Sequence, residues 1–250
     1  MVTLPILGFV ALSGQLLLLF ATVLAVFLGA LDIEHDSWLR RIHGAALPTL
    51  LTVGCFLVSR VLPGDLPEWL PLAVLAALLP AAFVVERAPH TSGWAIAASR
   101  PLVVYATALL LFVGIYGTRL RALLASPAMG MAAALLALSL WRNGPRLYDI
   151  ASLSRFSLVA KAAMGEAGRQ GILLPSLVVG LVLAQVAWPL LYWPVPALLG
   201  GLVLLAVFYA AAGLMAAAVH GTMHRGMAAE YALVGLASLA IIVAAVLRAP

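Results

Sequence analysis

The chain has 250 residues, of which 65% are apolar and only 9% are charged, and its 14 basic residues exceed its 9 acidic residues. Soluble domains are about half apolar and a quarter charged, so this composition excludes a soluble globular domain and indicates an integral membrane protein. The basic residues are scattered among loops and form no basic face with interleaved aromatic rings, which argues against a nucleic-acid partner. The single cysteine, Cys55, lies in an apolar run and excludes a disulfide framework.

Long apolar runs, taken in chain order, predict eight membrane-spanning helices, because a bilayer core about 30 Å thick requires roughly 20 apolar residues per helix. The first run carries no charge and lacks the basic segment and cleavage site of a removable signal peptide, so we interpret it as a retained span. The expected fold is an all-α polytopic transmembrane helix bundle, a single domain over residues 1–250. The expected spans are residues 3–31, 45–62, 69–85, 101–117, 122–141, 172–191, 197–219 and 231–247.

Two features decide the number of spans. The third run is short and contains Pro71 and Pro80, which weakens the prediction of a helix there. The uncharged stretch of residues 170–219 is too long for one helix, and the sequence WPLLYWPVP at residues 188–196 supplies prolines that end a helix and aromatic rings that favour the membrane interface. We therefore expect the chain to turn at this sequence, within an aromatic belt.

The distribution of basic residues predicts the orientation, because Lys and Arg are enriched in cytoplasmic loops. Eight spans with both termini outside place ten of the 14 basic residues on the inner side, whereas omitting the third span divides them five against nine. We therefore expect eight spans, with the N-terminus and the C-terminus outside. The ten inner residues are Arg40, Arg41, Arg87, Arg100, Arg142, Arg146, Arg155, Lys161, Arg169 and Arg225.

Residues 142–171 form the one sizeable segment expected outside the hydrocarbon, on the cytoplasmic side. Apolar residues such as Leu147, Ile150 and Leu153 recur there at helical spacing beside basic residues. This pattern predicts a helix lying in the membrane plane on anionic headgroups. A docking helix for a partner protein is the alternative, since amphipathicity suits both surfaces.

All five histidines fall on the inner side in this topology. His220 and His224 are four residues apart, a spacing that presents two imidazoles to one ion on a helix, and His35 and His43 with Asp32 or Glu34 would complete a zinc or iron site that activates water. The His-x-x-x-His pair resembles the pair near the C-terminus of alkaline-ceramidase-like membrane hydrolases, although the upstream Ser-x-x-x-His of those enzymes is missing here. The resemblance implies a metal-dependent enzyme that acts on lipid.

A structural interpretation of the same histidines predicts no cofactor. His220 at a helix C-terminus interacts with exposed carbonyl groups, Gly221 ends the helix, and His224 is then a polar loop residue at the headgroups. Glu230 is expected in the first turn of the last span, where an acidic side chain suits the helix dipole, or else as a proton donor or ligand beside His224. The spans otherwise hold almost no ionisable residues, which argues against a carrier for polar substrates.

The C-terminal quarter carries the sequences VAWPLLYWP (186–194), LLAVFYAAAGL (204–214) and AEYALVG (229–235). With these sequences the chain resembles an uncharacterised family of eight-span bacterial membrane proteins, a domain of unknown function. The resemblance implies a location in the bacterial cytoplasmic membrane and transfers no catalytic residue.

These observations favour a non-catalytic accessory or scaffold subunit that contacts lipid, an apolar ligand, partner membrane helices or further copies of itself, because the spans supply neither a relay nor a polar cavity. The alternatives are the metal-dependent enzyme at the inner headgroups and a carrier for an apolar small molecule.

Overall fold

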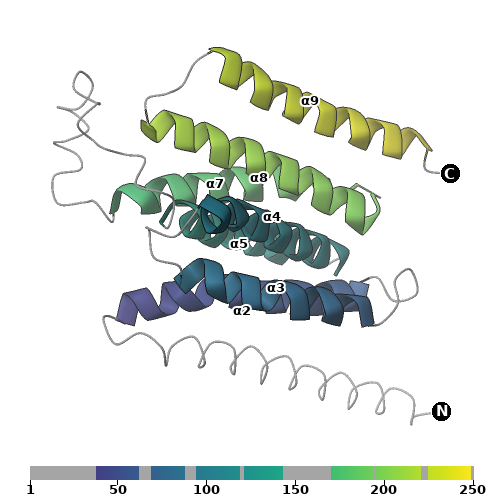
Figure 1. Cartoon of the computed structure of the whole chain (residues 1–250). Coiled ribbons are helices and arrows are strands. Elements are labelled where there is room, and N and C mark those ends of the chain that lie inside the picture. Colours follow the sequence, from purple (N-terminus) through teal and green to yellow (C-terminus); the bar gives the residue numbers. More distant parts are fainter. Residues whose placement is uncertain are drawn as a thin grey trace, which may run out of the picture.

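The computed structural model describes residues 38–61, 69–87, 94–118, 121–142, 170–193, 195–220 and 225–248. Every regular element in these ranges is an α-helix, which confirms the expected all-α class (Figure 1). The expected span 3–31 and nearly all of the interfacial segment 142–171 lie outside the described residues. The helices are α2 (Trp38–Val61), α3 (Trp69–Arg87), α4 (Trp94–Gly117), α5 (Ala122–Arg142), α7 (Gln170–Leu190), α8 (Ala197–His220) and α9 (Arg225–Arg248).

Four of the described helices contain a segment that is long and apolar enough to cross a membrane. These segments are Ser99–Gly117, Ala122–Trp141, Leu173–Leu190 and Ala197–Ala218, and shorter apolar segments, Ala46–Val61 and Ala73–Val85, lie in α2 and α3. A helix rises 1.5 Å per residue, so 20 residues extend about 30 Å, the thickness of the bilayer core. By the length and composition of its helices, the chain is therefore a membrane protein.

Three helices begin earlier than the apolar runs predict. α2 begins at Trp38, α4 at Trp94 and α9 at Arg225, whereas the runs begin at residues 45, 101 and 231. The additional turns contain polar residues, which a search for apolar runs does not detect. Pro101 does not start α4, because the helix already includes the turns before it, and a proline inside a membrane helix is tolerated when neighbouring groups satisfy the freed carbonyl.

α2 and α4 run in the same direction and lie in close contact. Gly54 of α2 packs against Leu110, and Gly114 of α4 packs against Leu57, so the contacting positions advance together along both helices. A Cβ atom added at Gly114 would lie only 2.5 Å from the Cβ of Leu57, which shows that the approach depends on glycine. Because parallel helices require the chain to return between them, α3 runs opposite to both.

α5 and α7 form an antiparallel pair with the same three small residues in each helix. The sequence Ser-x-x-x-Gly-x-x-x-Ala occurs at residues 126–134 in α5 and again at residues 176–184 in α7. Gly130 faces Gly180 at the crossing, where an added Cβ atom on Gly180 would lie 2.5 Å from the Gly130 carbonyl oxygen. The Ser126 hydroxyl donates a hydrogen bond of 2.7 Å to the Ala184 carbonyl oxygen of the other helix. Small residues thus let the two backbones approach, as is typical of membrane helix pairs.

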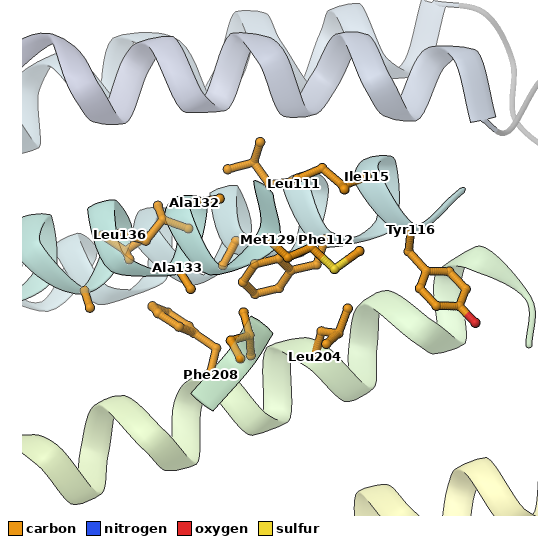
Figure 2. Packing of buried hydrophobic residues seen from close by; sticks show 14 of the residues in the cluster. Leu111, Phe112, Ile115, Tyr116, Met129, Ala132, Ala133, Leu136, Leu204 and Phe208 are labelled. Atoms are coloured by element: carbon orange, nitrogen blue, oxygen red, sulfur yellow. The ribbon is translucent and has the colours of Figure 1, made fainter. Parts of the chain in front are cut away.

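α4 lies at the centre of the described bundle and contacts α2, α3, α5 and α8. The helices are stacked side by side in Figure 1, with α2 and α3 towards one side, α4 and α5 in the middle, then α7 and α8, and α9 at the opposite edge. The buried cluster between α4, α5 and α8 is entirely apolar around Phe112, Met129 and Phe208, each of which is fully buried (Figure 2). The interior of this part of the bundle is filled by packed side chains.

Arg100 corrects the expectation that it lies in a cytoplasmic loop before the fourth span. It is part of α4, only 8% of its surface is exposed, and its Nη2 donates a hydrogen bond of 2.6 Å to the carbonyl oxygen of Val85. Val85 is close to the C-terminal end of α3, where carbonyl groups lack helical partners and the helix dipole is negative. Arg100 therefore joins α4 to the end of α3.

Candidate functional site

A continuous series of aromatic rings connects the buried core with α9. The series begins at Phe112 and Phe208 in the core and continues through tyrosines of α4, α8 and α9. Successive centroids are 6.0 Å apart for Phe112 and Phe208, 5.9 Å for Phe208 and Tyr105, 5.8 Å for Tyr105 and Tyr209, and 5.6 Å for Tyr209 and Tyr231. The rings are tilted or edge-on, with interplanar angles of 70°, 71°, 59° and 57° in the same order, which is a favourable geometry for aromatic pairs.

Gly213 allows α9 to join this series. The tip of the Tyr231 ring lies directly over Gly213, so closely that a side chain at position 213 would overlap the Tyr231 hydroxyl group. Tyr209 precedes Gly213 by one helical turn on α8, which places its ring beside that of Tyr231. The contact between α8 and α9 is therefore built from one glycine and two tyrosines.

Glu230 lies beside these rings and is the acidic member of the cluster. The Tyr209 hydroxyl donates to Glu230 Oε1 at 3.5 Å, which is longer than the 2.5–3.0 Å of a well-formed O–H···O hydrogen bond. Among the described residues, no ion pair involves Glu230. Its side chain is exposed, so most of the acceptor capacity of the carboxylate is available to another group.

The position of Glu230 differs from the one expected. It was expected in the first turn of the last helix, but α9 begins at Arg225 and no acidic residue occupies its first turn. Glu230 is five positions after Arg225, which corresponds to about 8 Å along the helix axis. Its partner Tyr209 is near the middle of the apolar segment Ala197–Ala218. Glu230 is therefore more than one turn inside α9, and its carboxylate contacts a tyrosine of the apolar segment of α8.

The cluster of Tyr105, Tyr209, Tyr231 and Glu230 combines a carboxylate with several aromatic rings. A carboxylate attracts cations and hydrogen-bond donors, and aromatic faces add a favourable cation–π interaction when a cation lies over them. This chemistry is that of a binding site for a positively charged group. It provides no nucleophile paired with a base and no set of metal ligands.

The described part of the structure does not test whether the histidines predicted as metal ligands lie close together. The backbones of His43 and His220 belong to α2 and α8, but their side chains, like all of His35, His90 and His224, lie outside what the structure describes. Asp32 and Glu34 also lie outside it. The described residues contain no group of three His, Cys, Asp or Glu side chains with the geometry of a metal site, and the histidine site stays a prediction.

Sequence reasoning missed the tyrosine series and the paired Ser-x-x-x-Gly-x-x-x-Ala sequences. Tyr209 and Tyr231 belong to different helices, so no spacing rule relates them. The two small-residue sequences are visible in the letters, but their antiparallel pairing depends on which helices become neighbours.

Residues 147–245 match the DUF5656 family. This family is described as proteins of unknown function. No curated protein and no solved structure matches the chain.

The DUF5656 match confirms the resemblance of the C-terminal part to an uncharacterised family, and it extends further upstream than the sequences that suggested it. It contains α7, α8 and most of α9, and with them Tyr209, Gly213, Glu230 and Tyr231. Tyr105 and the α5 partner of α7 lie outside the DUF5656 segment. The carboxylate and the two tyrosines nearest to it thus belong to one family segment.

Proposed function

We propose that this protein is a non-catalytic accessory or scaffold subunit of a membrane assembly, whose outer helix faces contact lipid, an apolar ligand or the helices of a partner. The arrangement of α9 carries the proposal. α9 packs mainly on α8, and its described side chains are mostly exposed, including Leu233, Leu236 and Glu230. Among the described helices α9 has one principal neighbour, and its exposed side is suited to receive a second helix.

The filled interior of the bundle supports the same proposal. Phe112, Leu136 and Phe208 are fully buried and occupy the space between α4, α5 and α8. The buried hydroxyls of Thr52 and Thr107 donate to carbonyl groups of their own helices and do not point into a shared polar space. A transport path for polar substrates requires polar groups at the midplane, and the described core provides packed apolar side chains there.

The proposed topology has eight spans in a bacterial cytoplasmic membrane, with both termini outside. Alternating helix directions support it, because α2 and α4 are parallel whereas α5 and α7 are antiparallel. α4 and α8 are also antiparallel, since Gly201 contacts Val113 and Phe208 contacts Tyr105. One accessible cysteine tests the topology. In a Cys55→Ala background, Ser157→Cys should react with an impermeant maleimide only from the cytoplasmic side, and labelling from outside overturns the orientation.

Native mass measurement tests the function. The protein is expressed in its own host membrane, extracted in a mild detergent and weighed intact. A partner or a stable oligomer at fixed stoichiometry is expected for an accessory subunit. A lone monomer overturns the proposal, and stoichiometric zinc or iron that is lost in both His220→Ala and His224→Ala would establish the metal-enzyme alternative in its place.

A further inference from the structure

We propose that the outer face of the α5–α7 pair contacts the lipid bilayer directly, and that one end of this face, around Arg121 and Trp188, lies among the phosphates of the lipid headgroups. This assignment goes beyond the proposed accessory role, which leaves the contacts of each outer face open between lipid, an apolar ligand and protein. A partner helix would then bind elsewhere on the bundle.

The shared Ser-x-x-x-Gly-x-x-x-Ala sequence places the exposed residues of α5 and α7 on one side of the pair. In both helices the residue that follows each small residue of the sequence is exposed. These residues are Pro127, Met131 and Leu135 in α5 and Leu177, Leu181 and Gln185 in α7. The helices are antiparallel and contact each other through the small residues, so equal offsets from the contact point to the same side. The two rows form one continuous outer face.

The exposed row on α7 changes its chemistry along the helix. Leu174, Leu177 and Leu181 are 69%, 61% and 60% exposed and lie in the apolar segment Leu173–Leu190. The next exposed residues at helical spacing are Gln185, Trp188 and Tyr192. Leucine suits hydrocarbon, whereas the amphipathic rings of Trp and Tyr favour the membrane interface. A bilayer imposes this order on a surface, because its hydrocarbon gives way to headgroups at one depth.

Arg121 lies on α5 at the level where the aromatic rings begin on α7. The hydrogen bond from Ser126 to the Ala184 carbonyl oxygen fixes the register of the antiparallel pair. Arg121, which directly precedes α5, is therefore level with the last residues of α7. Its side chain is exposed. A guanidinium group pairs with phosphate through charge-assisted hydrogen bonds, so the charge at this level complements the phosphates of lipid headgroups.

The end of α2 adds a second exposed arginine at the same level. Near the end of α4, the Tyr116 hydroxyl lies 3.1 Å from the Leu190 carbonyl oxygen, and the neighbouring Gly117 packs on Val61. These contacts align the ends of α2, α4 and α7. Arg60, in the last turn of α2, is exposed. The ends of three helices thus present aromatic rings and guanidinium groups in one layer, as a headgroup region requires.

Spin labels on single cysteines test the surroundings of this face. The variants Leu177→Cys, Leu181→Cys, Gln185→Cys and Tyr192→Cys are made in a Cys55→Ala background. An amphipathic copolymer excises them from the host membrane in discs that retain native lipid and any partner. Collisions of each label are measured with oxygen, which dissolves in hydrocarbon, and with a neutral nickel complex, which stays in water. We expect oxygen to dominate at the two leucine positions and nickel collisions to rise about tenfold from position 181 to position 192, because hydrocarbon excludes a polar complex.

Ala187→Cys is the control, because Ala187 is on the same helix but is fully buried. Its label should collide with oxygen less often than the label of Leu181→Cys. Rare collisions with both reagents at positions 177 and 181 would mean that protein covers the face, and this result overturns the proposal. Nickel collisions as frequent at position 181 as at position 192 would mean that water covers the face, which overturns it as well.

Solid-state NMR tests the contact with phosphate. Lipid phosphorus should dephase the guanidinium nitrogen signals of the reconstituted protein, and the dephasing should decrease in Arg60→Gln and in Arg121→Gln. Arg100→Met is the control and should leave the dephasing unchanged, because Arg100 is buried and donates to Val85. Dephasing in Arg60→Gln and Arg121→Gln equal to that of the wild type overturns the assignment of this end to the headgroups.

Failure of this proposal is distinguishable from failure of the accessory function. A face that protein covers in the native discs overturns the contact with lipid and leaves the accessory role standing, with the partner located on α5 and α7. A lone monomer in the native mass measurement overturns the accessory role and leaves the contact with lipid standing.

Discussion

Replacing Gly180 by alanine tests whether the close approach of α5 and α7 holds the bundle together. The added Cβ atom would lie 2.5 Å from the carbonyl oxygen of Gly130 and 2.9 Å from the Cβ of Ala134. A carbon atom approaches a carbonyl oxygen to about 3.3 Å at its closest, so the two backbones must separate by several tenths of an ångström. Neither neighbour can yield by rotating a side chain, because one is backbone and the other is alanine.

The expected loss follows from that separation. Overpacking of a tight site costs about 1–3 kcal/mol, and moving α7 also lengthens the hydrogen bond from Ser126 to Ala184, which contributes about 0.6 kcal/mol in a membrane protein. We expect Gly180→Ala to lower the free energy of unfolding by about 2 kcal/mol. Gly130→Ala should cost a similar amount, and the double variant should cost less than the sum, because one separation of the helices accommodates both Cβ atoms.

Gly235→Ala is the matched control. Gly235 is also inside a helix, α9, but a Cβ atom there meets nothing within 4 Å. Its free energy of unfolding should stay within about 0.5 kcal/mol of the wild-type value, or rise slightly because alanine is the better helix former. Unfolding is followed by circular dichroism during titration of dodecyl sulfate into mixed micelles. Equal stability of Gly180→Ala and Gly235→Ala refutes the reasoning.

Three further contacts give predictions of the same kind. Tyr116→Phe removes the hydroxyl that lies 3.1 Å from the carbonyl oxygens of both Leu190 and Trp193. It should lower the free energy of unfolding by about 1 kcal/mol. The control Tyr192→Phe changes an exposed ring and should leave the free energy of unfolding unchanged. Arg100→Met should destabilise the protein by about 2 kcal/mol, because it leaves the Val85 carbonyl without its charged donor. A thermal midpoint equal to that of the wild type in the same detergent would show that this hydrogen bond does not stabilise the fold. Gly213→Ala should loosen the contact of α9 with α8, because the new methyl group displaces the Tyr231 ring. Limited proteolysis should then cleave the chain at residues 221–224 faster than it does in the control variant Gly235→Ala.

The sequence predicts the all-α class and most helix ends, because runs such as residues 197–219 are long, apolar and closed by recognisable turn residues. It predicts helix beginnings less well. α4 starts at Trp94, and Arg100, in the turns before Pro101, is buried and donates to the Val85 carbonyl oxygen of α3. A contact with another helix is not written in local hydropathy.

The tyrosine–glutamate cluster is a tertiary feature, so the sequence predicts Glu230 only as a helix-end acid or as a proton donor or ligand beside His224. The contact of Glu230 with Tyr209, which is 21 residues away in the chain, becomes visible only in the structure. The histidines attracted attention because His-x-x-x-His is a local pattern. Local spacing identifies sites built from one helix, whereas this cluster needs three.

The DUF5656 boundary passes between the two members of the tightest helix pair. α7 lies inside residues 147–245, but the surface that fits against Gly180 and donates a hydrogen bond to the Ala184 carbonyl oxygen is provided by α5, which precedes the matched segment. A fragment limited to the matched residues would therefore carry an open groove along α7, lined by glycine, serine and alanine. We expect such a fragment to require the upstream half in trans: co-expression of the two halves as separate chains should restore the pair where either half alone is degraded.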